Sequence, residues 1–268
     1  MDNVKPVTDA PAPAIAPAPA TDAITPANDP TPTNLSKTRP EDFDGNVGTN
    51  DEIPSKETIA KVAEYRVQDK HGKSTPFKDL YQGSGQKRRV LVIFIRHFYC
   101  GNCQEYLRSL AASITPESLS SLPVSTSIVA IGCGDPALID MYVETTKWPF
   151  DIYTDPTASL FRELGMTKTL ALGKKPGYIK KGFFVNVLHS VGQALRAIPE
   201  GLAHKSGDQR QVGGEFLFEP LDKTSTAAEF EGEEKKVTWC HRMRTTRDHA
   251  EIPELMEVLG LEGGEKPN

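Results

Sequence analysis

An uninterrupted apolar run, VLVIFI at residues 90–95, constrains the fold more than any other segment of this 268-residue chain. It contains only β-branched, aliphatic and aromatic side chains. A strand with one face in water alternates apolar and polar residues, so this run predicts a central strand that is covered on both faces. We therefore expect an α/β fold with helices packed against a sheet.

A helix is expected to begin at the two cysteines that follow this run. Cys100 and Cys103 are one helical turn apart, and apolar residues recur at helical spacing from there until Pro116. A second apolar strand is predicted at 125–134 and a second helix at 136–147. Strand, helix and strand in this order predict a parallel pair of strands with a right-handed crossover.

The segment FDIYTDP (150–156) predicts a short strand and a turn. Asp155 and Pro156 are typical of a residue pair that starts a helix, and Gly165 is placed to end it. The other elements expected are a helix at 55–65, a short extended segment and loop at 74–85, strands at 214–220 and 235–241, and a closing helix at 251–260.

The first part of the chain has the composition of a segment that does not fold. Residues 1–40 hold nine of the 21 prolines and eight alanines, with no aromatic residue. Such a segment cannot bury enough apolar surface to offset the entropy lost on folding. Residues 1–53 carry nine acidic and three basic residues, a net charge of −6, against −5 for the whole chain. We expect a disordered Pro/Ala-rich acidic tail at 1–53 and one nearly neutral domain at 54–268.

Charge and hydropathy exclude several classes of partner. A nearly neutral domain gives no electrostatic reason to expect nucleic acid, and the acidic tail argues against an anionic membrane surface. We find no run of about 18 apolar residues and no pattern of a secretory signal. We therefore expect a cytoplasmic protein without a membrane span, in which the cysteines do not form a structural disulfide framework.

Residues 166–211 form a basic insertion, with eight Lys or Arg against two Asp or Glu. Apolar residues recur there at helical spacing and predict a helix that begins after Pro176. This apolar face either packs on the body of the domain, or roofs a substrate pocket or contacts a partner. Its positions are 184, 187, 188, 191, 195 and 198.

The spacing of Cys100 and Cys103 suits redox chemistry. A cysteine at a helix N-terminus meets free backbone N–H groups and the positive end of the helix dipole, which favour the thiolate. Cys100 is therefore the expected nucleophile. Cys103 lies one turn along, close enough to resolve an oxidised Cys100. The alternatives are a metal site, for which the chain offers too few further ligands, and a pair of ordinary buried thiols.

Two residues before the cysteines are further candidates for the site. Arg96 or His97 could supply positive charge or a proton to a leaving alkoxide. Tyr99 is expected to shield the thiols by packing, and Cys133 and Cys240 are expected to be structural.

The order of elements and the sequence around the cysteines resemble the thioredoxin-like superfamily, and within it the AhpC/TSA antioxidant enzymes of the peroxiredoxin-like 2 type. The resemblance implies a central mixed β-sheet flanked by helices, with a helical insertion before the third core strand. It rests on the blocks VLVIFIRHFYCGNCQEYLRSLA, FDIYTDPTASLFRELGM, QVGGEFLF and VTWCHRMRTTRDHAEIPELM.

By the same resemblance, the chain is expected to reduce peroxides or related O–O bonds through thiols, and some relatives reduce a lipid endoperoxide with electrons from NADPH. Cys100 takes the attacking position and Cys103 the resolving position. No bound cofactor is implied, and reducing equivalents are expected from NADPH through thioredoxin or glutathione. The expected partners are a thioredoxin-like reductant and a small peroxide or lipid-like substrate.

The chain departs from the relatives at two places. Peroxiredoxins carry Pro and Thr seven and three residues before the attacking cysteine, where this chain has Ile93 and His97. Thioredoxins carry a cis-proline before the third core strand, where this chain has the residues 211–214, QVGG. These departures weaken the expectation of fast hydrogen peroxide reduction and of disulfide docking in the thioredoxin manner.

Two hypotheses of function follow. The first is a thiol-dependent oxidoreductase that acts on a peroxide, endoperoxide or disulfide through Cys100 and Cys103. The second is a non-catalytic interaction module of the same fold, in which the cysteines are vestigial and the basic insertion or the acidic tail binds a partner. The pKa of Cys100 distinguishes them, because a vestigial thiol has no reason to ionise below the usual value of about 8.5.

Overall fold

The computed structural model describes residues 50–83, 88–179, 205–221 and 234–261. A seven-stranded sheet runs through them in the order β2-β1-β5-β4-β3-β6-β7. β3 pairs in parallel with β4 and antiparallel with β6, so the sheet is mixed, as predicted. The strands are β1 (Arg66–Gln68), β2 (Ser74–Pro76), β3 (Arg89–Phe94), β4 (Thr126–Gly132), β5 (Asp151–Thr154), β6 (Gly214–Pro220) and β7 (Lys235–Arg242).

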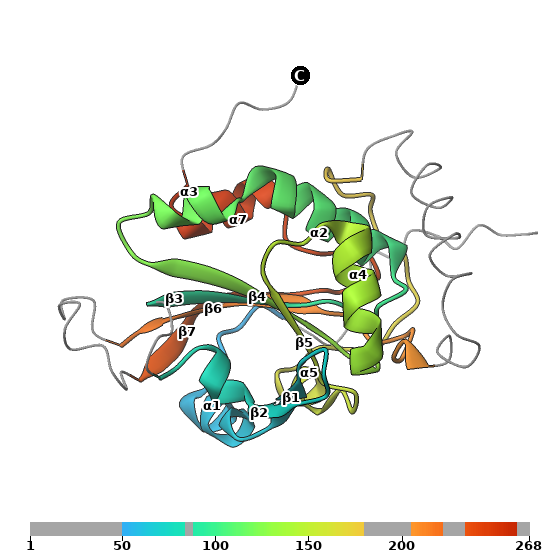
Figure 1. Ribbon diagram of the computed structural model, residues 1–268, viewed down its shortest axis with the longest axis horizontal. Coiled ribbons are helices and arrows are strands. Elements are labelled where there is room, and N and C mark those ends of the chain that lie inside the picture. The colour runs from blue at the N-terminus through green and yellow to red at the C-terminus, as the bar shows by residue number, and fades with distance from the viewer. Residues whose placement is uncertain (1–49, 84–87, 180–204, 222–233, 262–268) are drawn as a thin grey trace, which may run out of the picture. The chain divides into compact units, whose positions relative to one another are not determined.

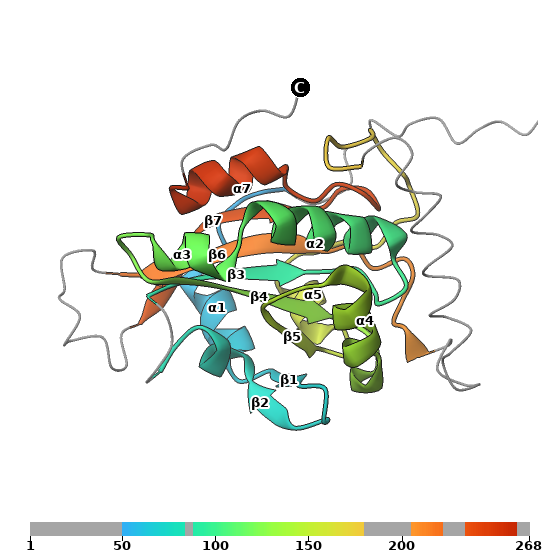
Figure 2. The same ribbon diagram turned by 45° about the horizontal axis from the view of Figure 1, so that its top comes forward.

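Helices cover both faces of this sheet (Figure 1). α2, α3, α4 and α7 lie on one face and α1 and α5 on the other, and Figure 2 shows α2 and α7 side by side above β3 and β6. The helices are α1 (Lys56–Ala63), α2 (Gly101–Ser113), α3 (Pro116–Ser120), α4 (Ile139–Thr146), α5 (Ser159–Glu163) and α7 (Ile252–Leu259), with 3-10 turns η1 (Phe77–Leu80) and η2 (Pro136–Leu138). None of the described helices has the length and hydropathy needed to cross a bilayer.

Successive side chains of β3 point to opposite faces of the sheet, which explains why helices cover both faces. Leu91 and Ile93 belong to the core beneath α2 and α7, whereas Val92 and Phe94 belong to the core on the side of α1 and α5. All four side chains are buried. The prediction of a central strand without a solvent-exposed face is confirmed, and so is the predicted central mixed sheet flanked by helices (Figure 1).

Local sequence signals also act as expected at the start of α5. Asp155 accepts hydrogen bonds from the backbone N–H groups of Thr157 and Leu160, at 3.0 and 2.8 Å. Gly165 follows the helix with a φ of 82°, a conformation that favours glycine. The hairpin of β1 and β2 was not predicted, since strands of three residues are too short to show an alternation.

The two ends of the basic insertion are bonded to each other. Lys168 and Gln211 form an isolated antiparallel bridge, and Thr169 N–H donates to the carbonyl of Arg210 at 2.7 Å. Tyr178 is buried in the core beneath α2. The predicted helix and its apolar face fall on 180–204 and therefore lie outside the described residues.

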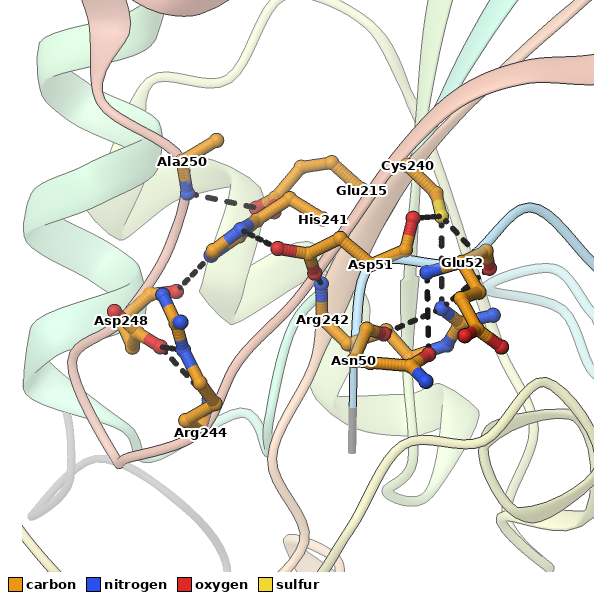
Figure 3. A network of polar contacts seen from close by, with 10 residues as sticks. All are labelled: Asn50, Asp51, Glu52, Glu215, Cys240, His241, Arg242, Arg244, Asp248 and Ala250. Atoms are coloured by element: carbon orange, nitrogen blue, oxygen red, sulfur yellow. Dashed lines mark hydrogen bonds and ion pairs between the residues drawn. The ribbon is translucent and has the colours of Figure 1, made fainter. Parts of the chain in front are cut away.

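The segment Asn50–Glu52, which sequence analysis assigned to the tail, lies along β7 (Figure 3). The Arg242 guanidinium donates to the carbonyl oxygens of Asn50 and Glu52, at 2.6 and 2.8 Å, and Arg242 N–H donates to Asp51 Oδ1 at 2.7 Å. These bonds join residues about 190 positions apart, so no local pattern could predict them. The remainder of the predicted tail, residues 1–49, lies outside the described part of the chain.

The same network holds His241 on β7. Its ring nitrogens lie 3.5 Å from Asp51 Oδ2 and 2.7 Å from the Asp248 carbonyl oxygen. Burial lowers the pKa of His241, but the interactions with Asp51, Glu215 and the Asp248 carbonyl outweigh this effect and raise the pKa to about 9. His241 is therefore an imidazolium at neutral pH.

We expect the substitution Asp51→Asn to destabilise the fold at low pH more than at high pH. Because the pKa of His241 is about 9 in the folded chain and about 6.5 in an unfolded chain, its charge stabilises the fold fully below pH ~6.5 and not above pH ~9. Asn keeps an oxygen for Arg242 N–H but removes the negative charge. Since Asp51 is 44% exposed, we expect a loss of about 1 kcal/mol at pH ~6 and less at pH ~10. Denaturant unfolding at both pH values measures this, and equal losses would contradict it.

Candidate active site

Cys100 is the N-cap residue of α2, where sequence analysis expected the helix to begin. Residues 95–99 form the loop that leads from the end of β3 to this position. Cys100 N–H donates to the His97 carbonyl oxygen at 3.0 Å, and Cys103 N–H donates to Cys100 Sγ at 3.4 Å. Both cysteines are free thiols, with 3% of Cys100 and 0% of Cys103 exposed. The sulfur of Cys100 thus takes the place of the capping oxygen at a helix N-terminus.

Arg96 contributes a positive charge to the same sulfur. Its Nη1 lies 3.2 Å from Cys100 Sγ. The guanidinium is held by three carbonyl oxygens, those of Gln209 at 2.5 Å, Gln211 at 3.2 Å and Thr246 at 3.4 Å. In the described ranges no carboxylate forms an ion pair with Arg96, so the sulfur is the group that gains from its charge.

The two sulfurs differ in their ionisation. Burial raises the pKa of Cys100, but the hydrogen bond with Cys103 and the Arg96 guanidinium outweigh burial and hold this pKa well below the usual range. Burial and the neighbouring Cys100 raise the pKa of Cys103 well above its usual range. The surroundings therefore favour the thiolate at Cys100 and the protonated thiol at Cys103.

His97 is buried beside this pair, but its ring forms no hydrogen bond with Cys100. Burial lowers the pKa of His97, so the ring is neutral at neutral pH. Its Nδ1 is buried without a hydrogen-bond partner among the described residues. Of the two predicted neighbours, Arg96 contacts the sulfur directly, and His97 contributes a backbone carbonyl and an unsatisfied ring nitrogen.

Sequence analysis missed two residues near Cys103, of which His249 contacts the sulfur and Glu215 contacts His249. His249 Nε2 is 3.3 Å from Cys103 Sγ, and His249 Nδ1 is 2.6 Å from Glu215 Oε1. The side chains of His249 and Glu215 are 0% exposed. The signal available in the sequence was a glutamate inside the apolar strand GEFLFEP, but nothing local connects it with a histidine 34 residues later.

The other cysteines lie in less reactive surroundings. Cys133 donates to the Arg96 carbonyl oxygen at 2.7 Å, and burial raises its pKa to about 12. Burial also raises the pKa of Cys240, which packs on the opposite face of the sheet with α1 and α5. Tyr99 packs against the core that contains Cys100 and Cys103. Within the described ranges, no three His, Cys, Asp or Glu side chains are grouped so that they could hold a metal ion.

Comparison with known proteins identifies the family. The model of the family described as AhpC/TSA antioxidant enzyme matches residues 109–245, about half of the chain. The chain belongs to the AhpC/TSA family. The matched segment begins inside α2, so it contains Glu215 but not Cys100, Cys103 or His249. The predicted membership is confirmed, and it supports a function of the thiol oxidoreductase type.

The chain is also similar to individual proteins and to a solved structure. The human protein Peroxiredoxin-like 2C is 28% identical over 205 residues, which are 76% of this chain and 80% of that protein. Peroxiredoxin-like 2C of Takifugu rubripes is 27% identical over 207 residues, 76% of this chain and 82% of that protein. Among solved structures, the peroxidoxin BcpB of Mycobacterium tuberculosis is 11% identical with a TM-score of 0.45, covering 76% of this chain and 96% of that one.

We expect Arg96→Met to raise the pKa of Cys100, because it removes the cation 3.2 Å from the sulfur. One pKa unit corresponds to about a tenfold smaller thiolate fraction at a pH below the pKa. Alkylation of Cys100 at pH ~6, followed by peptide mass analysis, should therefore slow about tenfold or more. Arg96→Lys, which keeps the charge, is the matched control. Equal alkylation rates in the Met variant and the unaltered chain would contradict the assignment of Arg96.

Proposed function

We propose that the chain is a thiol-dependent reductase of O–O bonds in which Cys100 attacks and Cys103 resolves. The observation that carries the proposal is the contact of Arg96 Nη1 with Cys100 Sγ at 3.2 Å, at a helix N-terminus and one turn from a second thiol. A buried cation and an N-terminal amide favour the thiolate, which is the nucleophilic form.

The reaction proceeds in two steps. The Cys100 thiolate attacks the terminal O–H oxygen of a hydroperoxide, an S–O bond forms, the O–O bond breaks, and the other oxygen leaves as an alkoxide or hydroxide that takes up a proton from solvent. Cys100 is then a sulfenic acid. The sulfur of Cys103 next attacks Cys100, the S–O bond breaks, and the oxygen leaves as water with the proton from Cys103. Two electrons from thioredoxin or glutathione, and ultimately NADPH, reduce the disulfide.

A small or lipid-like peroxide suits this site better than a protein disulfide. Only 3% of Cys100 is exposed, so a substrate must present its reacting bond through a narrow approach. His97 Nδ1 is buried without a described partner, and a hydrogen bond with a substrate oxygen would satisfy it. We propose that His97 serves this purpose in place of the Thr that peroxiredoxins carry at this position.

The alternative function is a non-catalytic interaction module with vestigial cysteines. This alternative does not explain why the pKa of Cys100 is held below the usual range. It also does not explain why three carbonyl oxygens hold the Arg96 guanidinium beside the sulfur. Redox function explains both.

The proposal predicts the products of a single oxidation. After one equivalent of peroxide, we expect a disulfide between Cys100 and Cys103, with Cys133 and Cys240 still free because burial raises their pKa values. Cys100→Ser should abolish turnover. Cys103→Ser should stop at a sulfenic acid on Cys100, which a dimedone adduct would reveal. Intact-mass and peptide analysis measures all three outcomes.

A turnover assay identifies the substrate class. Thioredoxin, its reductase and NADPH are supplied with hydrogen peroxide, an organic hydroperoxide, an endoperoxide or a small disulfide, and NADPH oxidation is followed. We expect turnover with organic peroxides that exceeds turnover with hydrogen peroxide. A disulfide mapped to Cys133 or Cys240, or unchanged turnover in Cys100→Ser, would overturn the proposal.

A further inference from the structure

Three buried side chains from separate parts of the chain form a continuous hydrogen-bonded line. Cys103 comes from α2, His249 from the loop before α7, and Glu215 from β6. The distances are 3.3 Å from Cys103 Sγ to His249 Nε2 and 2.6 Å from His249 Nδ1 to Glu215 Oε1. Glu215 Oε2 also accepts from Ala250 N–H at 3.4 Å (Figure 3).

The orientation of the imidazole is fixed on several sides. Its ring stacks on Tyr106, with 4.1 Å between the ring centroids and 4° between the planes. An ionised carboxylate can only accept hydrogen bonds, so Glu215 requires that Nδ1 carries the proton. In the neutral imidazole Nε2 is then left as an acceptor, and Nε2 is the atom that faces Cys103.

We propose that His249 is the general base that removes the proton of Cys103 during resolution, and that Glu215 orients His249 and stabilises its protonated form. This inference rests on the proposed function, in which Cys103 attacks an oxidised Cys100. His249 touches the reacting sulfur and is thus catalytic, whereas Glu215 acts through His249 and is a positioning residue.

The need for a base follows from the state of Cys103. The pKa of this thiol is raised by burial and by Cys100, so at neutral pH it holds a proton that must leave before the sulfur can attack. Ionisation of Cys103 alone would place a second anion in the core beside the Glu215 carboxylate. When the proton moves to His249 instead, the net charge of the thiol, the imidazole and the carboxylate together stays at −1. No additional net charge is therefore buried.

Atoms and charge are conserved when this proton transfer is part of the resolution step. The proton of Cys103 moves to His249 Nε2, the thiolate attacks the sulfur of Cys100, and the S–O bond breaks. The departing hydroxide takes the proton from the imidazolium and leaves as water, which restores neutral His249. The peroxide of the first step is the oxidant, so no further reactant is required.

Other ionisable groups surround this line and must be considered in a pH profile. Tyr106 from α2 stacks on the imidazole, and Tyr178 from the insertion packs against Tyr106. Burial raises the pKa of both tyrosines, so neither ionises near neutral pH. His241 on β7 faces Glu215 across the β6–β7 pair and is charged at neutral pH. Arg96 and Cys100 lie on the far side of Cys103.

The test separates attack by Cys100 from resolution by Cys103. Reduced full-length chain is mixed with one equivalent of methyl methanethiosulfonate, a small reagent that places a methylthio group on Cys100 and releases a sulfinate. Cys103 then displaces methanethiol and closes the disulfide. Samples quenched in acid are analysed by intact mass and peptide mapping, which gives both rates in each protein. A parallel series uses an organic hydroperoxide and dimedone.

In His249→Asn the amide nitrogen stands near the position of Nδ1 and can still donate to Glu215, but no group faces Cys103. We expect unchanged methylthiolation of Cys100 and about a hundredfold slower resolution at neutral pH. The residual resolution rate should rise about tenfold per pH unit, because hydroxide must then remove the proton. Glu215→Gln, which keeps an acceptor for Nδ1, should slow resolution about tenfold and alter its pH profile. His71→Asn, at an exposed histidine, is the control that should change neither rate.

The result is expressed as the ratio of the resolution rate to the methylthiolation rate within each protein. Because poor folding would change both rates, this ratio remains informative even if a variant loses stability. Resolution in His249→Asn at the unaltered rate and with the unaltered pH profile would overturn the inference. The methylthio series could behave as expected while no peroxide yields a sulfenic acid at Cys100. In that case His249 remains the general base, and the proposed reduction of O–O bonds is wrong. A Cys100 that forms neither adduct overturns both proposals.

Discussion

The structure depends on one electrostatic constraint, the stabilisation of negative charge on the sulfur of Cys100, a residue that is only 3% exposed. An isolated buried anion is costly, so its surroundings must supply positive charge and hydrogen-bond donors without bulk water. The amide at the start of α2 and the guanidinium of Arg96 supply them at Cys100. The rest of the fold holds these two groups against the sulfur, from β3, which ends beside it, to the carbonyl oxygens that fasten Arg96.

This constraint explains the glycines at the start of β6. A Cβ at Gly213 would lie 1.8 Å from the Phe94 carbonyl oxygen, which no side chain can tolerate. The backbone before β6 can therefore approach the end of β3 closely, and this approach brings the Gln211 carbonyl to Arg96. In thioredoxins a cis-proline occupies this region. Here two small residues and a buried glutamine take its place, and the described residues contain no cis peptide bond.

The sequence predicted the elements that carry strong local patterns, and it predicted them close to their observed bounds. The apolar run of β3, the helical spacing after Cys100 and the turn at Asp155 each depend on neighbours within a few residues. The contacts that join distant segments could not be predicted in this way. Glu215, His249 and Cys103 come together through tertiary packing over as many as 146 residues, and Asp51 contacts β7 across 191 residues.

The same limit applies to the choice between Arg96 and His97. Alternation along an ideal strand allows only one of them to share the face of the cysteines, but β3 ends at Phe94, and the following loop no longer alternates. Arg96 therefore reaches the sulfur while the His97 carbonyl accepts from Cys100 N–H, and both residues border the same helix start.

The bridge between Lys168 and Gln211 has a consequence for how this protein can vary. The pairing of Lys168 with Gln211 closes the intervening chain at one point on the domain. The entropy of closing such a loop grows only with the logarithm of its length, about 0.6 kcal/mol for each doubling. Residues can thus be added or lost between positions 168 and 211 without displacing the Gln211 carbonyl that holds Arg96, so the length of this segment can change in evolution while the surroundings of Cys100 stay in place.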